Sequence, residues 1–420
     1  MKYCAITLKR WNIVWSYGLD TSACFEANLL PSEGTYSNWR EPLRFTGKAS
    51  GTPVFANPKH LSRLLLNPYA TGFLSILPML SRLFMGGVLI AIGLVVSSQA
   101  REPKSSQVEL SGFEVEFPAL GTLVSIKVFS SDEELVARTV QAAKLRTQEL
   151  ESILTDYDPD SETSKLTTLA AGEAFVPVSA ELWNVLAASD RWHKLSQGAF
   201  DASIGSLSRL WRIQRRTKSP IDPTKFEDAS LRSGWEHVQI NRESNSVRFD
   251  RDGVRLDFGA IGKGYVVDEI FQLLQDQGLR SCLVNISGNM RCGDAPPDRS
   301  GWRIAIAPLE QDQPPLRQLV FSNIAIATSG DLWQYVVVDG QRRSHILDPR
   351  TGQSIRGPIA ATVLAPTAMD ADACATAVCV LGPTAGAHLV VEQANIKALI
   401  LEHSNPQLPI RYIATPGLQR

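Results

Sequence analysis

The sequence predicts an α+β fold for residues 101–420, with mixed strands and packed helices rather than a doubly wound parallel sheet. This prediction rests on the spacing of apolar residues along the chain. They recur with period two in several short segments and with a helical period in others, and the two kinds of segment do not alternate strictly along the chain. The composition is that of a globular chain, because 44% of the 420 residues are hydrophobic and 20% are charged.

The first predicted elements are one strand and two helices. Residues 122–129 predict the strand, because valine and isoleucine alternate there with polar residues. A helix begins after Ser131, where acidic residues occupy the first turn and apolar residues then recur at helical spacing as far as Leu154. The second helix is predicted over residues 179–196.

The rest of the chain predicts shorter elements. Residues 254–258 alternate and predict a strand. Residues 264–277 predict a helix that ends at Gly278, because glycine readily takes the left-handed conformation that closes helices. Further strands are predicted at 281–286, 302–307, 319–328 and 332–339. Two helices and a last strand follow at 371–381, 384–393 and 396–401.

The first hundred residues differ from the rest in composition. They hold nine Lys and Arg against four Asp and Glu, a net charge of +5. Arg82 precedes an apolar run of 14 residues, 83–96, and small residues end the segment at Ala100. This order is typical of a secretory signal, and the run is short for a membrane span. We expect residues 79–100 to be a signal peptide, and residues 1–78 to be a disordered extension or the result of a start assigned too far upstream.

An uncleaved anchor is the alternative for the same segment, and residues 83–96 would then associate with the membrane. Residues 79–100 contain no cysteine, so the lipobox of exported lipoproteins is missing. We therefore expect an exported protein without a lipid anchor, either periplasmic or attached to the inner membrane and facing the periplasm.

The charge balance, the cysteine spacing and the nucleotide motifs argue against several functional classes. The 42 Lys and Arg are balanced by 43 Asp and Glu, which argues against binding of nucleic acid. The six cysteines form no C-x-x-C pair, which argues against a zinc ribbon or a thioredoxin motif. Oxidation after export could still join Cys282 with Cys292, or Cys374 with Cys379. The nucleotide motifs also fail, because Asp257 stands where a Walker A loop needs glycine and Val267 where a dinucleotide-binding loop needs it.

The glycine-rich segment 257–264 is the first candidate site. Glycines let the backbone approach a ligand, the amides at the start of the next helix attract phosphate, and Lys263 adds a positive charge. A tight turn between a strand and a helix needs the same glycines. The segment therefore has a structural interpretation as well as a phosphate-binding one.

Two other groups can carry chemistry. Asp372 and Thr376 lie four residues apart on a predicted helix, so they share a face and offer oxygen ligands of the kind that Mg²⁺ takes. A solvated face, or a threonine bonded to its own backbone, gives the same pattern. His345 precedes the predicted turn at Asp348 and could act as a general base for a hydroxyl group. A packed, hydrogen-bonded histidine is the commoner case.

Taken in order, eight segments resemble the motifs of the ApbE family, the FAD:protein FMN transferases, over residues 113–403. Members of this family are exported, which agrees with the predicted signal. The eight segments are 119–122, Tyr157 with Ser161, 198–201, 256–265, 285–288, 327–331, 344–352 and 371–376.

The resemblance implies a T-fold-like arrangement of mixed sheets and a Mg²⁺-dependent reaction. FMN would pass from FAD to a Thr or Ser hydroxyl of an acceptor flavoprotein, and AMP would leave. His345 would be the catalytic base. The metal would be held by Asp372, Thr376 and the backbone carbonyl of Ala260. The FAD site would be lined by Tyr157, Ala199, Phe200, Asp201, Asp257, Lys263 and Ile346.

Four positions depart from the family's pattern. Leu120 stands where methionine is usual and Gly262 where alanine is usual, and the segment Ser287-Gly288-Asn289 stands where Gly-Gly-Asp is usual. The last change removes a carboxylate, so we assign Asn289 no role. The family's acceptor motif is absent from this chain, so the FMN would go to another protein and FAD would be held without a covalent bond.

Two other functions remain open from the sequence. Water as the acceptor would make the chain a FAD pyrophosphatase that yields FMN and AMP. Binding without turnover would make it a FAD-storage protein. Storage needs no metal, so Asp372, Thr376 and His345 together favour catalysis.

Overall fold

The computed structural model describes residues 110–310, 313–338, 341–403, 407 and 409–418. The extension predicted at residues 1–78 and the signal or anchor segment predicted at residues 79–100 lie outside the described residues. Both therefore stay predictions.

An eight-stranded sheet forms the centre of the described fold, and its strands do not follow the order of the chain. Every pairing between neighbouring strands is antiparallel, so the prediction of an α+β fold rather than a doubly wound sheet is confirmed. From one edge to the other the strands are β1 (Ser111–Ala119), β2 (Thr122–Ser130), β6 (Cys282–Ile286), β7 (Asn289–Cys292), β10 (Ile324–Gly330), β14 (Ile359–Ala365), β15 (Lys397–Glu402) and β16 (Arg411–Ala414).

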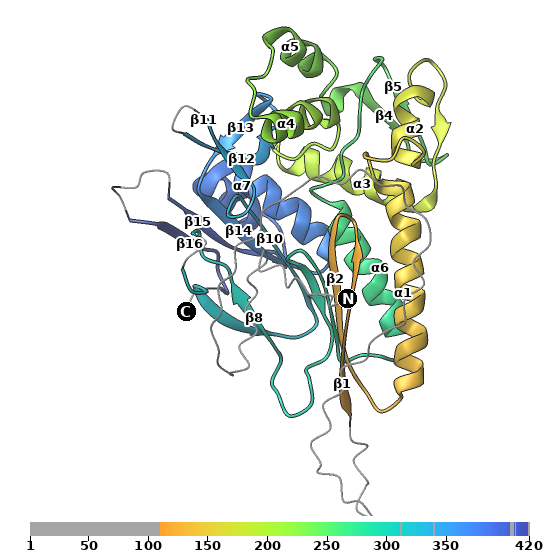
Figure 1. The fold of residues 1–420 in the computed structure, drawn as a ribbon, viewed down its shortest axis with the longest axis vertical. Coiled ribbons are helices and arrows are strands. Elements are labelled where there is room, and N and C mark those ends of the chain that lie inside the picture. The colour runs from red at the N-terminus through yellow and green to blue at the C-terminus, as the bar shows by residue number, and fades with distance from the viewer. Residues whose placement is uncertain (1–109, 311–312, 339–340, 404–406, 408, 419–420) are drawn as a thin grey trace, which may run out of the picture. The chain divides into compact units, whose positions relative to one another are not determined.

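Helices cover one face of this sheet (Figure 1). α6 (Gly262–Asp276) packs against β6 and β7, α7 (Ala368–Val391) packs against β10, β14 and β15, and α1 (Glu133–Leu154) lies along α6. The hairpin of β8 (Trp302–Ile306) and β9 (Arg317–Phe321) covers part of the other face. The sheet is therefore the middle layer of three.

Alternation along β10 shows how the sequence builds these layers. Ala325 and Ala327 belong to the main core under the helices, and Ile326 between them belongs to the cluster under the β8–β9 hairpin. Successive side chains on a strand point to opposite faces, so a strand covered on both sides is apolar at every position.

A second group of elements lies at the end of the helical layer where α7 begins (Figure 1). α4 contacts β12, and the indole nitrogen of Trp211 on α4 donates a hydrogen bond of 2.9 Å to the Gly352 carbonyl oxygen. The group comprises α2 (Glu162–Leu169), α3 (Ala180–Leu195), α4 (Gly205–Thr217), α5 (Pro223–Leu231), η1 (Trp235–His237), the sheet of β3 (Val176–Pro177), β5 (Ser246–Phe249) and β4 (Val238–Asn241), and the sheet of β11 (Tyr335–Val338), β12 (Gln341–Asp348) and β13 (Gln353–Arg356).

Side-chain caps begin the first two predicted helices, and both helices are present. The carboxylate of Asp132 accepts a hydrogen bond of 2.8 Å from the Leu135 amide at the start of α1. The hydroxyl of Ser179 accepts one of 3.2 Å from the Leu182 amide at the start of α3. Such caps satisfy amides that have no partner within the helix.

The later helices differ from prediction at their ends. α6 begins at Gly262, two residues before the predicted start. The helices predicted at 371–381 and 384–393 are joined as α7, which is kinked at Gly382 with φ of 76°. Pro383 follows the kink, because proline cannot donate the hydrogen bond that continues a helix. α7 is long and apolar enough to cross a membrane, but it belongs to the main core.

The strand predicted at residues 254–258 is wrong. The alternation is real, since Val254, Leu256 and Phe258 are all buried. The backbone, however, forms a single isolated bridge, from Arg255 to Ile204, so no ladder develops. Alternate burial indicates an extended chain, and a strand also needs a partner along its length.

Other strand predictions need smaller corrections. The segment 319–328 contains parts of two strands, because Asn323 takes a left-handed φ of 52° and turns the chain between β9 and β10. The strand predicted at 332–339 is shorter and corresponds to β11. The sequence does not predict β14, since all seven residues of that strand are buried and no alternation marks it. Also missed are β1, β3, β4, β5, β7, β12, β13, β16, α2, α4, α5 and η1.

Neither candidate disulfide forms, and the four described cysteines are free and buried. Cys282 and Cys292 belong to core clusters on opposite faces of the sheet. Cys374 and Cys379 are five residues apart on α7 and point to different sides of the helix. Burial raises the pKa of all four thiols, which keeps them protonated and unreactive.

Candidate active site

The N-terminal ends of α6 and α7 meet at the centre of the candidate site. A Cβ atom at Gly264 would lie 2.2 Å from the Ala368 carbonyl oxygen, so only glycine allows the two helices to approach this closely. The Gly264 amide donates a hydrogen bond of 3.1 Å to Oδ2 of Asp372. This contact places the glycine-rich turn before α6 beside Asp372 on α7.

Asp268 of α6 fixes the first turn of α7. Its carboxylate accepts hydrogen bonds of 2.9 Å from the amides of both Ala368 and Met369. Arg291 of β7 pairs with the same carboxylate at 2.7 Å. Since these amides have no partner within α7, the contact orients the helix and thereby the side chain of Asp372 one turn later.

Asp372 is a buried carboxylate whose charge is only partly compensated. Burial raises the pKa of Asp372, and the positive charge of Lys263, whose Nζ lies 3.9 Å from Oδ2, opposes this shift. Because the pKa of Asp372 is raised, a further cation nearby would stabilise its ionised form. One turn along α7, Thr376 Oγ1 lies 3.1 Å from Ser329 Oγ on β10.

The donors at this point are all oxygens. Asp372 and Thr376 offer a carboxylate and a hydroxyl one turn apart on α7. The Ala260 carbonyl, the third ligand implied by the family resemblance, lies in the turn before α6, and α6 bonds to Asp372 through the Gly264 amide. One carboxylate with neutral oxygens fits Mg²⁺, which also keeps waters and substrate phosphates as ligands. Among the described residues, no three His, Cys, Asp or Glu side chains group together as a metal site. A zinc-type site is therefore not supported in this part of the chain.

His345 lies on β12, and the backbone of Gln334 orients its ring. Nδ1 of His345 lies 3.2 Å from the Gln334 carbonyl oxygen, so we assign the proton to Nδ1 and the lone pair to Nε2. Burial lowers the pKa of His345 to about 4, and the positive charges of Arg215 and Lys263 act in the same direction. The ring is therefore neutral near pH 7 and can accept a proton at Nε2.

Asp257 is held by Arg212 of α4, a residue that the sequence analysis does not single out. Nη2 of Arg212 lies 2.5 Å from Oδ2 of Asp257, and Nη1 lies 2.5 Å from Oδ2 of Asp156. Burial alone would raise the pKa of Asp257, but the charge of Arg212 and the hydrogen bonds to the carboxylate outweigh it and lower the pKa. Asp257 therefore stays ionised in the folded protein.

Arg212 also supports the ring of Tyr157. The guanidinium carbon of Arg212 lies 4.5 Å from the centre of the Tyr157 ring, and Tyr157 is 75% exposed. A ring held on one face and open elsewhere can stack on the flat ring of a ligand. The signal for this arrangement was present in the sequence, because Leu207, Leu210 and Trp211 have the spacing of a helix that carries Arg212.

Residues 199–201 are more deeply buried than residues that bind a ligand through their side chains would be. Ala199 and Phe200 are 1% and 2% exposed, and Ile346 beside His345 is 7% exposed. Contact between a ligand and these three positions would come through the backbone.

The carboxylate of Asp201 is occupied by neighbouring groups. Oδ1 accepts hydrogen bonds from the Ser203 amide at 2.7 Å and the Ser203 hydroxyl at 2.6 Å. Oδ2 accepts a hydrogen bond of 2.9 Å from the Trp235 amide. The side chain of Asp201 therefore orders this turn before α4.

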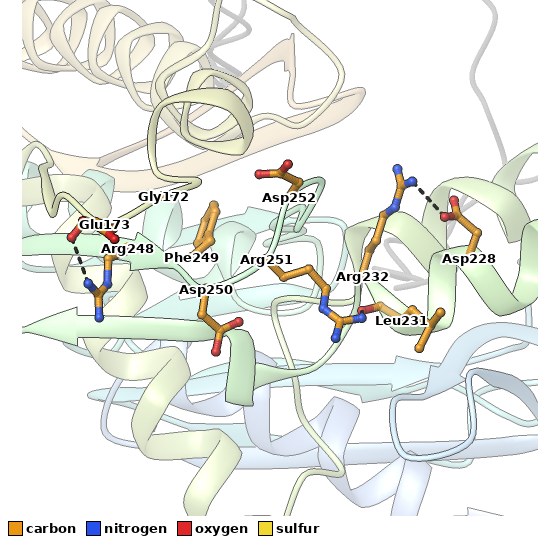
Figure 2. A pocket seen from close by; sticks show the side chains of 10 residues that line it. All are labelled: Gly172, Glu173, Asp228, Leu231, Arg232, Arg248, Phe249, Asp250, Arg251 and Asp252. Carbon is orange, nitrogen blue, oxygen red and sulfur yellow. Dashed lines mark hydrogen bonds and ion pairs between the residues drawn. The ribbon is translucent and has the colours of Figure 1, made fainter.

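A cavity of about 720 Å³ lies apart from these residues, and no residue of the predicted site lines it (Figure 2). Two of its arginines have local partners. Arg232 pairs with Asp228 at 2.8 Å, and Arg248 donates a hydrogen bond of 2.8 Å to the Glu173 carbonyl oxygen (Figure 2). We therefore do not assign the active site to this cavity.

Comparison with known proteins decides the family. The ApbE family model matches residues 120–400. A curated relative named FAD:protein FMN transferase, from Vibrio cholerae, is 33% identical over 312 residues, which cover 73% of this chain and 90% of the relative. The chain belongs to the ApbE family. A relative of the same name from Treponema pallidum is 30% identical over 334 residues, covering 75% of this chain and 90% of the relative.

Solved structures of ApbE proteins have the same fold. The flavin transferase ApbE from Vibrio cholerae superimposes with a TM-score of 0.67 at 27% identity, covering 73% of this chain and 98% of the other. The apo form of the flavinyl transferase ApbE from Pseudomonas stutzeri gives a TM-score of 0.65 at 28% identity, covering 73% and 96%. The resemblance to this family seen in the sequence is thereby confirmed.

Proposed function

We propose that this ApbE-family chain is a FAD:protein FMN transferase, which moves FMN from FAD to a hydroxyl group of another protein and releases AMP. The observation that carries the proposal is the neutral His345, whose pKa is lowered in part by the charge of Lys263, while Nζ of Lys263 lies 3.9 Å from the Asp372 carboxylate, a proposed metal ligand. Curated relatives bear the name of this activity. The acceptor is a second protein, because the chain lacks an acceptor motif of its own.

His345 is the proposed base of this reaction. Nε2 takes the proton of the acceptor Thr or Ser hydroxyl as the hydroxyl oxygen bonds to the phosphorus of the FMN half of FAD. The bond from this phosphorus to the bridging oxygen breaks, and its electron pair leaves with AMP. Phosphoryl transfer depends on positioning and charge neutralisation more than on covalent catalysis, and Lys263 supplies part of the charge.

The proposed metal is Mg²⁺, held by Asp372, Thr376 and the Ala260 carbonyl. When bound, it would neutralise pyrophosphate charge and polarise the reacting phosphate. We further propose that FAD is held without a covalent bond, by stacking on Tyr157, by Asp257 and Lys263, and by the backbone of Ile346 and of residues 199–201.

The first experiment combines the purified full chain with FAD, Mg²⁺ and an acceptor domain that carries the family's flavinylation motif. AMP is followed by chromatography and the mass of the acceptor by mass spectrometry. Release of AMP with an equal gain of FMN mass on the acceptor is the expected result. AMP with free FMN instead would identify a FAD pyrophosphatase. FAD binding without AMP would identify a storage protein.

Substitutions test the metal site in the same assay. Thr376→Val and Asp372→Asn should each remove most Mg²⁺-dependent turnover, because the first deletes a proposed hydroxyl ligand and the second removes the negative charge and one oxygen of the carboxylate. Ser329→Ala is the matched control, since it deletes the hydroxyl bonded to Thr376 but no proposed ligand. Wild-type rates at low Mg²⁺ in both ligand variants would overturn the metal assignment.

A further inference from the structure

Arg215 is a basic residue of α4 that the proposed mechanism does not yet use. It lies three residues after Arg212 and four after Trp211, so the three side chains share one face of the helix. That face is packed on the β12–β13 hairpin, because Trp211 bonds to Gly352 and belongs to one apolar cluster with Leu347 of β12. His345 lies two residues before Leu347 on the same strand.

The side chain of Arg215 is half-buried and has no hydrogen bond or ion pair with any described residue. It lies within electrostatic reach of His345 and Tyr157. Its neighbour Arg212 is cationic, and Asp257, whose charge also acts on Arg215, is already bonded to Arg212. Arg215 is therefore a half-buried cation near His345 and Tyr157 that forms no ion pair of its own.

Such a placement is unfavourable in the free protein. Burial and the like charge of Arg212 both lower the pKa of Arg215. A partly desolvated cation that keeps no partner is destabilising unless a ligand supplies the opposite charge. Arg216 is the next residue on the same helix, is exposed and avoids this penalty.

We propose that Arg215 binds a phosphoryl oxygen of the FAD pyrophosphate, as a second cation beside Lys263. This inference rests on the proposed function, because that function supplies a dianionic pyrophosphate at His345. A guanidinium offers paired donors that match two phosphate oxygens, whereas the Lys263 ammonium acts as a point charge. Arg215 would thus neutralise charge on the substrate, and it would place the reacting phosphorus near Nε2 of His345.

The test compares flavins that share one ring system and carry two phosphates, one phosphate or none, although FAD alone also carries adenosine. Binding of FAD, FMN and riboflavin to the purified full chain is measured by calorimetry, with Mg²⁺ and again with EDTA. Arg215→Gln should weaken FAD binding roughly ten- to a hundredfold, the range for a lost charge-assisted hydrogen bond, and leave riboflavin binding unchanged. Arg215→Lys should recover part of the loss, because the charge returns without the paired donors.

Arg216→Gln is the matched control, since it removes the same charge from an exposed position on the same helix, and it should bind FAD like the wild type. Equal affinity for FAD in Arg215→Gln and wild type would overturn the inference. Equal losses for FAD and riboflavin would also overturn it, because they would indicate a general disturbance of the site. Failure of the wild type to bind FAD at all would instead overturn the proposed function.

Discussion

His345 shows how neighbouring groups set the chemistry of a single residue. An ordinary histidine is partly protonated near pH 6.5 and loses its capacity as a base there. In this protein, burial and the charges of Arg215 and Lys263 lower the pKa of His345 to about 4. The Gln334 carbonyl acts in the opposite direction by accepting the Nδ1 proton, but it also fixes the ring with Nε2 available.

The lowered pKa predicts the pH dependence of the reaction. A general base works in its neutral form, so kcat/KM should stay level as the pH falls through 6.5 and decline only as it approaches about 4. Arg215→Gln removes a cation, raises the pKa of His345 and should move the decline to higher pH. His345→Ala should keep FAD binding and lower the rate roughly 10²- to 10⁴-fold.

The measurement is a pH–rate profile for wild type and Arg215→Gln, with circular dichroism at each pH to confirm that the chain stays folded. A decline centred near pH 6.5 in the wild type would contradict the assigned environment of His345. Normal turnover by His345→Ala would remove the residue from the chemistry.

At the scale of elements, the contact between α6 and α7 builds the site. Gly264 allows the contact, its amide binds Asp372, and Asp268 holds the first turn of α7. The helices therefore bring the glycine-rich turn and the proposed metal ligands together without a dedicated loop. The neighbouring glycine has no such role, because a Cβ at Gly262 would lie 3.4 Å from the Phe258 Cβ, an ordinary contact.

This difference gives a paired prediction. Gly264→Ala should lower the free energy of unfolding by about 1–3 kcal/mol, because the added methyl overpacks the helix contact, and it should also reduce Mg²⁺-dependent turnover by displacing Asp372. Gly262→Ala, in the same first turn of α6, should retain both stability and activity. Thermal unfolding and the AMP assay measure the two effects. Equal stability of the two variants would contradict the proposed role of Gly264.

At the scale of the whole molecule, the site lies where the helical layer meets the second group of elements. α6 and α7 supply Lys263 and Asp372, α4 supplies Arg212, and β12 supplies His345. The core beneath is continuous from the sheet to these helices, so packed elements hold Lys263, Asp372, Arg212 and His345, while Tyr157, Asp257 and Ala260 lie in the turns between elements.

We also propose that the protein is exported, a proposal that rests on the composition of residues 79–100 alone. N-terminal sequencing of the protein from the periplasmic fraction should then begin at Arg101. A full-length chain in the membrane fraction would support the anchor alternative, and a full-length chain confined to the cytoplasm would contradict export.

Local pattern predicted part of the fold. The starts of α1 and α3 beside Asp132 and Ser179, the bounds of β2, β6 and β15 to within one residue, and the break in α7 at Pro383 all follow from neighbouring residues, and so they could be predicted. β14 and the pairing of residues 254–258 could not, because full burial erases alternation and pairing depends on a distant partner.

The sequence by itself determined the family and the α+β class, and it supplied the residues proposed for the site. The tertiary structure alone decided how these residues act on one another. Arg212 reaches Asp257 across 45 residues, and the Gly264 amide reaches Asp372 across 108. Charge, burial and hydrogen bonding act through space, so the ionisation of Asp257, the neutrality of His345 and the lack of an ion pair at Arg215 arise only when the folded chain brings these groups together.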